Sequence, residues 1–126
     1  MADTSFVIEP AEMQHLVETL GAIGEQAGGG IIRHVYDPAW VAARQQLADW
    51  MREAGLAVRE DAVGNLFGRI QGDSPRTILT GSHVDTVRLG GRYDGALGVL
   101  SALAALRVLG STAGRPRRSL EMVGLC

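Results

Sequence analysis

The chain has 126 residues, of which 46% are hydrophobic and 21% are charged, and its formal net charge is -2 at pH 7. This composition is typical of a globular domain and excludes a disordered or fibrous chain, and the length predicts a single domain. The acidic balance, with a sequence pI near 5.9, gives no general attraction to nucleic acid or anionic lipid, so neither is an expected partner. Arg115, Arg117 and Arg118 form a local basic cluster, which we interpret as the solvated entrance to a strand rather than a phosphate site.

Cysteine content and the N-terminal sequence indicate the compartment. Cys126 is the only cysteine, so an intrachain disulfide is excluded and a reducing compartment, the cytoplasm, is expected. Residues 1–6 lack the basic region and apolar run of a signal peptide, and no stretch approaches the roughly 20 apolar residues of a membrane span. We therefore expect a protein that is neither exported nor embedded in a membrane.

Two helices are predicted in the first half of the chain. Pro10 suits the first position of a helix that runs from Ala11 to Gln26, and the glycines at residues 28–30 are predicted to end it. The second helix has a capping aspartate and a proline at residues 37–38 and closes at Gly55, which reaches the left-handed conformation without steric cost. Its apolar stripe consists of Trp40, Ala43, Leu47, Trp50, Met51 and Ala54.

Short strands are predicted next. Residues 56–59 and 65–70 suit two strands that are separated by a turn at residues 61–64, and a further turn is expected at residues 72–75. Residues 77–80 are mostly apolar and β-branched without polar alternation, which predicts a strand that is covered on both faces.

The last third of the chain continues the alternation of strand and helix. A helix from about Gly95 to Leu109 is apolar on nearly every side, and a strand is predicted from Ser119 to Cys126. This order predicts an α/β fold with a largely parallel central sheet and crossover helices. The apolar helix needs more partners than 126 residues supply and the chain ends on a strand, so we expect residues 1–126 to be the N-terminal part of a larger domain.

His83 and Asp85 follow the strand predicted at residues 77–80, at the edge where α/β sheets place their ligands. Strand alternation separates their side chains, unless the chain turns at this point. If it turns, the imidazole of His83 can bind a metal ion while the carboxylate of Asp85 holds the other ring nitrogen. Asp85 is then an orienting group rather than a ligand.

Asp94 lies beyond a glycine-rich loop, at the predicted start of the apolar helix. Its carboxylate can cap the first turn of that helix or offer both oxygens to two metal ions, and these roles do not exclude each other. Gly90, Gly91 and Gly95 allow the backbone to fold closely around such ions. Taken singly, a histidine at a strand end is more often structural and an aspartate here is more often a cap, whereas their combination makes a metal site as plausible as these structural roles.

The same segment carries a family resemblance. The sequences GSHVDTV at residues 81–87 and GGRYDGALGV at residues 90–99 resemble the hydantoinase/carbamoylase amidases of the wider M20 metallopeptidase-like group. The resemblance extends back through DAVGNLFGR at residues 61–69 and covers the chain from about Tyr36 onward. It implies a partial three-layer metallopeptidase-like catalytic domain that cleaves linear amide bonds of ureido or N-carbamoyl compounds, such as allantoate or N-carbamoyl amino acids.

Carried over by position, the resemblance makes His83 a ligand of one metal ion and Asp94 the carboxylate that bridges two ions, with Asp85 orienting the His83 ring. It implies two divalent ions, of which Zn or Mn is the first choice and Co or Ni also suits these ligands. True peptidases of the group usually follow the aspartate with a methionine-lysine-glycine type segment, whereas residues 94–98 resemble the amidases. The substrate-binding residues are not indicated by the sequence.

The resemblance also implies parts that residues 1–126 lack. A glutamate pair, which supplies the general base and another ligand, is expected just after the last strand, and further histidines and a lid and dimerisation domain are expected later still. We therefore expect this piece to be inactive alone and the full-length protein to be a homodimer. The alternatives are an M20-type dipeptidase or aminoacylase, or a non-enzymatic truncated homologue that acts through protein contacts.

The remaining polar residues receive structural interpretations. His15 on the first helix and His34 in a loop match no ligand position, Asn65 is expected to hold a turn, and Cys126 is interpreted as a buried strand residue. No G-x-G-x-x-G or G-x-x-x-x-G-K-[ST] sequence is present, so dinucleotide or triphosphate binding is not expected.

Overall fold

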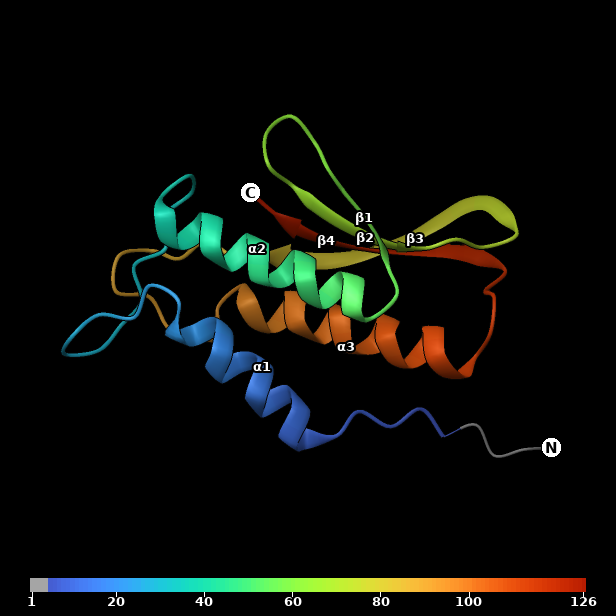
Figure 1. The fold of residues 1–126 in the computed structure, drawn as a ribbon, viewed down its shortest axis with the longest axis horizontal. Helices are drawn as coiled ribbons and strands as arrows, with labels where there is room; N and C mark the ends of the chain where they lie inside the picture. The colour runs from blue at the N-terminus through green and yellow to red at the C-terminus, as the bar shows by residue number, and fades with distance from the viewer. Residues whose placement is uncertain (1–4) are drawn as a thin grey trace.

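The computed structural model describes residues 5–126 (Figure 1). The absence of a signal peptide was inferred partly from residues 1–4, which lie outside the described residues. Between residues 5 and 126, no helix combines the length and the apolar character that crossing a membrane requires. The elements in chain order are α1 (Pro10–Ala22), α2 (Pro38–Glu53), β1 (Ala57–Glu60), β2 (Leu66–Ile70), β3 (Ser74–His83), α3 (Ala96–Thr112) and β4 (Arg118–Leu125).

The strands form one mixed sheet in the order β1-β2-β4-β3. β1 with β2 and β2 with β4 are antiparallel pairs, whereas β3 and β4 run parallel. The α/β class is confirmed, but the expectation of a largely parallel sheet is wrong. The reason lies in the connections: residues 61–65 are too few for a crossover, which takes about a dozen residues or more, so β1 and β2 form a hairpin. The connection between β3 and β4 does contain a crossover helix, α3.

Helices cover one face of the sheet among the described residues. α2 packs on β1 and β2, α3 packs on β3 and β4, and α1 packs on α3 (Figure 1). Of the three layers implied by the resemblance, residues 5–126 thus provide the sheet and the helices on one side. On the opposite face, Glu121 is 6% exposed and pairs with Arg59 at 3.2 Å and Arg69 at 3.5 Å.

β3 starts earlier and is more exposed than the sequence predicts. It begins at Ser74, so the turn expected at residues 72–75 is shorter, and its register with β4 shifts between Ser74 and Thr77. Ile78 is 49% exposed and Leu79 is 55% exposed, so the expectation of a strand covered on both faces is wrong. β3 is an edge strand whose one neighbour in the described chain is β4, and Leu79 pairs with Glu121 on the face without helices.

α1 ends at Ala22 rather than at Gln26. Gly24 has a φ of +89°, and a Cβ atom there would lie 2.5 Å from the carbonyl oxygen of Ile32. The amide of Ile32 donates to the carbonyl of Gly24 at 3.0 Å, which brings the chain back along the end of the helix. The early end of α1 therefore places the following segment beside the loop after β3.

α2 begins and closes as predicted. Asp37 caps it, with Oδ1 accepting from the amide of Trp40 at 2.7 Å and Oδ2 accepting from the amide of His34 at 2.8 Å. Gly55 follows the helix at a φ of +80°. Four residues of the predicted stripe are buried and two are half-buried: Trp40, Ala43, Leu47 and Met51, and Trp50 and Ala54.

α3 is largely buried, as its apolar sequence predicts, although Leu97 is 42% exposed. α3 packs on β3, β4 and α1, so the helix lies between the sheet and α1 (Figure 1). Its buried side chains are Ala96, Val99, Leu100, Ala102, Leu103, Ala104 and Leu106. The basic cluster at residues 115, 117 and 118 is exposed and leads into β4, which confirms its interpretation as a solvated strand entrance.

Replacing Asp37 with alanine is expected to lower the free energy of unfolding by about 1 kcal/mol at neutral pH, because the Trp40 amide loses its acceptor. That hydrogen bond holds the pKa of Asp37 below its ordinary value. The stabilisation is therefore present above the carboxyl pKa of the unfolded chain and is lost as the pH falls through the lowered pKa of the folded state. Urea unfolding at a series of pH values should show the difference between wild type and Asp37→Ala shrinking toward acid. Asp37→Asn, which keeps one acceptor oxygen, should lose less, and equal losses would contradict this account.

Candidate metal centre

β3 and β4 run parallel and end side by side, with His83 opposite Leu125. This is the edge of the sheet at which α/β proteins bind ligands. After His83 the chain leaves the strand and reaches α3 through residues 84–95. The site is therefore built from the last residue of β3 and the loop that leads into α3.

The chain turns after His83 and brings Asp85 back onto the histidine ring. Nδ1 of His83 lies 3.0 Å from Oδ1 of Asp85 and 3.1 Å from the backbone carbonyl oxygen of Asp85. Both neighbours of Nδ1 are acceptors, so in the neutral ring the proton belongs on Nδ1 and Nε2 keeps its lone pair. The structure thus shows the turn that the orienting role of Asp85 requires.

Asp94 lies on the opposite side of the same ring. Its Oδ1 is 4.0 Å from Nε2 of His83, and its side chain is 77% exposed. The residue at the helix N-terminus is Gly95, and no side-chain hydrogen bond caps α3. The alternative in which Asp94 caps the helix is therefore wrong, because the chain turns one residue later and leaves the carboxylate free of the first turn.

Gly95 determines where the His83 ring lies. Its φ is +71°, and a Cβ atom there would lie 2.4 Å from Cε1 and 2.5 Å from Nδ1 of His83. Any side chain at this position therefore occupies the space of the ring. Of the glycines that the sequence singled out, Gly95 packs on the histidine, and Gly90 pairs with Ile31 through amide and carbonyl at 2.9 Å each.

The loop after β3 is fastened to residues 31–33. The amide of Thr86 donates to the carbonyl of Arg33 at 2.9 Å, and the amide of Arg33 donates to Oγ1 of Thr86 at 3.0 Å. The hydroxyl of Thr86 in turn donates to the carbonyl of Ile31 at 3.1 Å. These hydrogen bonds hold the loop at Thr86, and the pairing of Ile31 with Gly90 holds it at a second position.

Arg33 is the polar residue of this region that the sequence did not indicate. It is 1% exposed, and its guanidinium donates to the carbonyls of Val84, Leu20 and Ile23 at 2.7–2.8 Å. Burial lowers the pKa of Arg33 from its ordinary value, and the charges of Asp37 and Asp85 oppose that shift. No local pattern identifies an arginine whose acceptors are backbone carbonyls from distant segments, so only the structure reveals it.

The donor chemistry fits a metal ion, and Nε2 of His83 and Oδ1 of Asp94 face each other at 4.0 Å. An imidazole nitrogen and a carboxylate suit Zn, Mn, Co or Ni. Across residues 5–126 the structure gathers no group of three or more histidine, cysteine or acidic side chains that could hold a metal ion. His83 and Asp94 are thus two candidate ligands, while the carboxylate of Asp85 lies against Nδ1 of His83.

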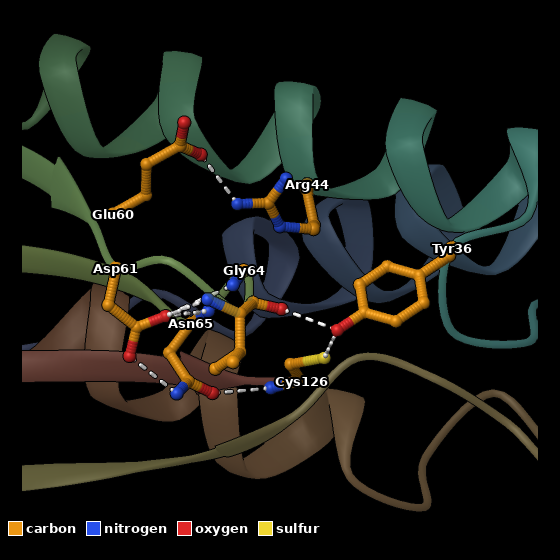
Figure 2. A network of polar contacts seen from close by, with 8 residues as sticks. Tyr36, Arg44, Glu60, Asp61, Gly64, Asn65 and Cys126 are labelled. Carbon is orange, nitrogen blue, oxygen red and sulfur yellow. Dashed lines mark hydrogen bonds and ion pairs between the residues drawn. The ribbon is translucent and has the colours of Figure 1, made fainter.

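A second polar network holds the end of β4 near this edge (Figure 2). Oδ1 of Asp61 accepts the amides of Val63, Gly64 and Asn65 at 2.9–3.1 Å. Nδ2 of Asn65 donates to Oδ2 of Asp61 at 2.7 Å, and Oδ1 of Asn65 accepts the amide of Cys126 at 2.8 Å. These hydrogen bonds to the carboxylate lower the pKa of Asp61. Asn65 holds the turn as predicted, and it also fixes the backbone that leaves β4.

Tyr36 completes this network. Its hydroxyl donates to the carbonyl of Val63 at 2.8 Å and lies 3.6 Å from Sγ of Cys126, a contact that raises the pKa of Tyr36 (Figure 2). Cys126 is exposed, so its interpretation as a buried strand residue is wrong. β4 ends at Leu125, so the cysteine lies outside the strand. His15 and His34 are exposed, and within residues 5–126 neither imidazole pairs with His83, Asp85 or Asp94.

Comparisons with known proteins identify the family. The model of Peptidase family M28 matches residues 65–126. The allantoate amidohydrolase of Bacillus subtilis (strain 168) is 47% identical over 112 residues, which are 87% of this chain and 27% of that protein. The N-carbamoyl-L-amino-acid amidohydrolase of Pseudomonas sp. (strain NS671) is 37% identical, with the same coverage of 87% and 27%. A crystal structure of a hydantoinase/carbamoylase family amidase from Burkholderia ambifaria has a TM-score of 0.88 at 36% identity, covering 93% of this chain and 29% of that one.

Over 93% of its length the chain is similar to an amidase of the hydantoinase/carbamoylase family. The resemblance carried by residues 81–99 is thereby confirmed, and so is the metallopeptidase-like fold class. The matching family model is that of M28, where the sequence resemblance pointed to the M20 group. The chain spans about 27% of the length of these curated amidase relatives.

Replacing Gly95 with alanine is expected to displace the His83 ring and to lower the free energy of unfolding by about 1–3 kcal/mol, since a methyl group there meets the ring at a positive φ. Gly91→Ala is the matched control, because a Cβ atom at Gly91 has no neighbour within 4 Å. Thermal unfolding measures the loss, and the ¹⁵N resonances of the His83 ring report whether Nδ1 keeps its proton. Similar results for the two variants would show that the ring does not depend on Gly95.

Replacing Asn65 with alanine is expected to lower the free energy of unfolding by about 1–3 kcal/mol, because two side-chain hydrogen bonds are lost. Val63→Ala is the control in the same turn, since the Val63 side chain is 55% exposed and its carbonyl is retained. The control should change stability by less than about 0.5 kcal/mol. Urea unfolding distinguishes the two variants, and an Asn65→Ala protein as stable as the control would argue against the role of this network.

Proposed function

We propose that the protein containing this chain is a metal-dependent amidohydrolase that cleaves a linear amide C–N bond of a ureido or N-carbamoyl compound. The observation that carries the proposal is the arrangement around His83, with Asp85 on Nδ1 at 3.0 Å and Asp94 beyond Nε2 at 4.0 Å. Relatives with this segment are named allantoate amidohydrolase and N-carbamoyl-L-amino-acid amidohydrolase. Allantoate and N-carbamoyl amino acids are therefore the proposed substrates.

The described side chains have distinct roles in this proposal. His83 and Asp94 would hold divalent metal ions of the Zn or Mn type. When bound, such ions lower the pKa of a water molecule and polarise the scissile carbonyl. Asp85 keeps the proton on Nδ1 and so aims the Nε2 lone pair toward Asp94. Gly95 leaves the space in which the ring lies.

The general base and the remaining ligands are proposed to come from parts of the protein outside residues 1–126. A catalytic zinc site usually has at least three protein ligands, and His83 and Asp94 supply two. The carboxyl end of β4 lies opposite His83, so a residue that follows Leu125 is close to the site. We propose that residues 1–126 alone are inactive, that the whole protein is a homodimer, and that it is cytoplasmic, as a single cysteine suits a reducing compartment.

The second candidate is a dipeptidase or aminoacylase. It is favoured by the matching family model, which is named for peptidases and covers the site residues. Against it stand the names of the relatives at 47% and 37% identity, both amidohydrolases. A third reading, a non-enzymatic homologue, leaves the pairing of His83 with Asp85 and Asp94 without a chemical role.

Side-by-side assays of the protein made from its complete gene test the proposal. Allantoate, an N-carbamoyl-L-amino acid, an N-acetyl amino acid and a dipeptide are offered with added Mn²⁺ or Zn²⁺. We expect hydrolysis of one of the first two, loss of activity on chelation, and recovery on return of the metal ion. A preference for the dipeptide would establish the peptidase instead, and inactivity with all four substrates would support the non-enzymatic homologue.

Variants of the site residues test the role proposed for each side chain. His83→Ala and Asp94→Ala should lower kcat by at least about 10³-fold, because each removes a proposed ligand. Asp85→Asn should lower metal affinity by roughly 10–100-fold, as expected for a group that orients a ligand. His15→Ala, which changes an exposed histidine on α1, is the control and should retain wild-type activity. Full activity of His83→Ala would exclude the proposed site.

A further inference from the structure

The strongest unexplained feature of the described chain is the buried charge of Arg33. Its side chain is almost completely removed from solvent, at 1% exposure, and its hydrogen bonds go to backbone carbonyls. An arginine stays protonated in a protein, so this charge is held inside the fold. Burying a cation that has no directly bonded carboxylate costs free energy unless the cation is well hydrogen-bonded. The buried charge of Arg33 therefore needs an explanation in terms of what its hydrogen bonds hold.

One side of the guanidinium binds the carbonyl groups at the C-terminal end of α1. Nη1 donates to the carbonyls of Leu20 and Ile23, both at 2.8 Å. These residues form the end of the helix, where the helix dipole favours a positive charge, and the carbonyl of Leu20 also accepts the amide of Ile23 at 3.2 Å. The arginine therefore caps α1, and this contact alone is structural.

The other side of the guanidinium reaches the metal-site loop. Nε donates to the carbonyl of Val84 at 2.7 Å. That carbonyl belongs to the peptide group that joins Val84 to Asp85. The hydrogen bond therefore restrains the orientation of the peptide group that precedes the Asp85 side chain. Asp85 then meets Nδ1 of His83 through both its carboxylate and its backbone carbonyl. The hydrogen bond to Val84 therefore restrains the backbone from which both Asp85 acceptors extend.

The backbone of the same residue adds a second hold on the loop. Arg33 exchanges hydrogen bonds with Thr86, amide to hydroxyl at 3.0 Å and carbonyl to amide at 2.9 Å. Asp85 is thus held on both sides, by the guanidinium at Val84 and by the backbone at Thr86. Arg33 therefore contacts the residues on both sides of Asp85.

We propose that Arg33 is a positioning residue of the metal site, which acts by fixing the Val84–Asp85 peptide so that Asp85 holds Nδ1 of His83 and leaves Nε2 directed at the metal ion. The inference rests on the proposed function in that it takes His83 as a metal ligand. It assigns to the buried charge a role beyond the closing of α1.

Arg33→Lys tests this role in the protein made from its complete gene. Lysine keeps the positive charge near the end of α1 but has no donor at the position of Nε, so the hold on Val84 is lost. We expect affinity for Zn²⁺, measured by competition with a chromogenic chelator, to fall by roughly 10–100-fold. In the metal-free protein, the ¹⁵N resonances of His83 should change from a ring protonated on Nδ1 to a mixture of tautomers.

Leu20→Ala is the control for a purely structural effect. Leu20 is fully buried on α1, so this variant loses stability without removing any bond to the loop after β3. Its Zn²⁺ affinity, measured below the unfolding temperature, should stay within about threefold of wild type. If Arg33→Lys lowers the unfolding temperature but binds Zn²⁺ like wild type with an unchanged His83 tautomer, the proposal is overturned.

Thr86 provides a second pair of variants in case Arg33→Lys does not fold. Thr86→Val removes the hydroxyl that bonds Arg33 and Ile31 while keeping the shape of the side chain, and Thr86→Ser keeps the hydroxyl. We expect the valine variant to lose Zn²⁺ affinity and the serine variant to retain it; equal affinities overturn the proposal. A wild-type protein that binds no Zn²⁺ but shows the Nδ1 tautomer, lost in Thr86→Val, would reject the proposed function and leave the positioning role of this segment intact.

Discussion

The buried guanidinium of Arg33 is the interaction on which the arrangement of the site depends. Its charge lies inside the fold at 1% exposure, so backbone carbonyls have to converge on it. Two of them come from the end of α1 and one comes from Val84, just after β3. The early end of α1, the return of the chain at Gly24 and the path of the loop after β3 are all consistent with this one requirement.

The position and the protonated nitrogen of the His83 ring are set by the groups on each side of it. Asp85 occupies Nδ1, Gly95 leaves room for the ring, and Asp94 lies beyond Nε2. The three groups come from the loop after β3 and the approach to α3, so they are close in sequence. Their relative positions nevertheless depend on residues 31–33, because the loop itself contains no helix or strand that could hold it.

The mixed sheet explains why the site lies at an edge of the described chain. β3 has a strand partner on one side, and its apolar residues Ile78 and Leu79 are about half exposed. β4, which pairs with both β2 and β3, brings its carboxyl end next to His83. The network of Asp61, Asn65 and Tyr36 then fixes the backbone at that end (Figure 2).

The sequence alone determined the features that depend on local chemistry. The cap at Asp37, the end of α2 at Gly55 and the apolar α3 follow from residue types that act within a few positions of one another, and the family resemblance singled out His83, Asp85 and Asp94. Only the tertiary structure decided the strand directions, the exposure of β3 and the role of Arg33. These depend on which distant segments meet, and the hydrogen bonds of Arg33 to Thr86 and Val84 span 53 and 51 positions, beyond the reach of any local pattern.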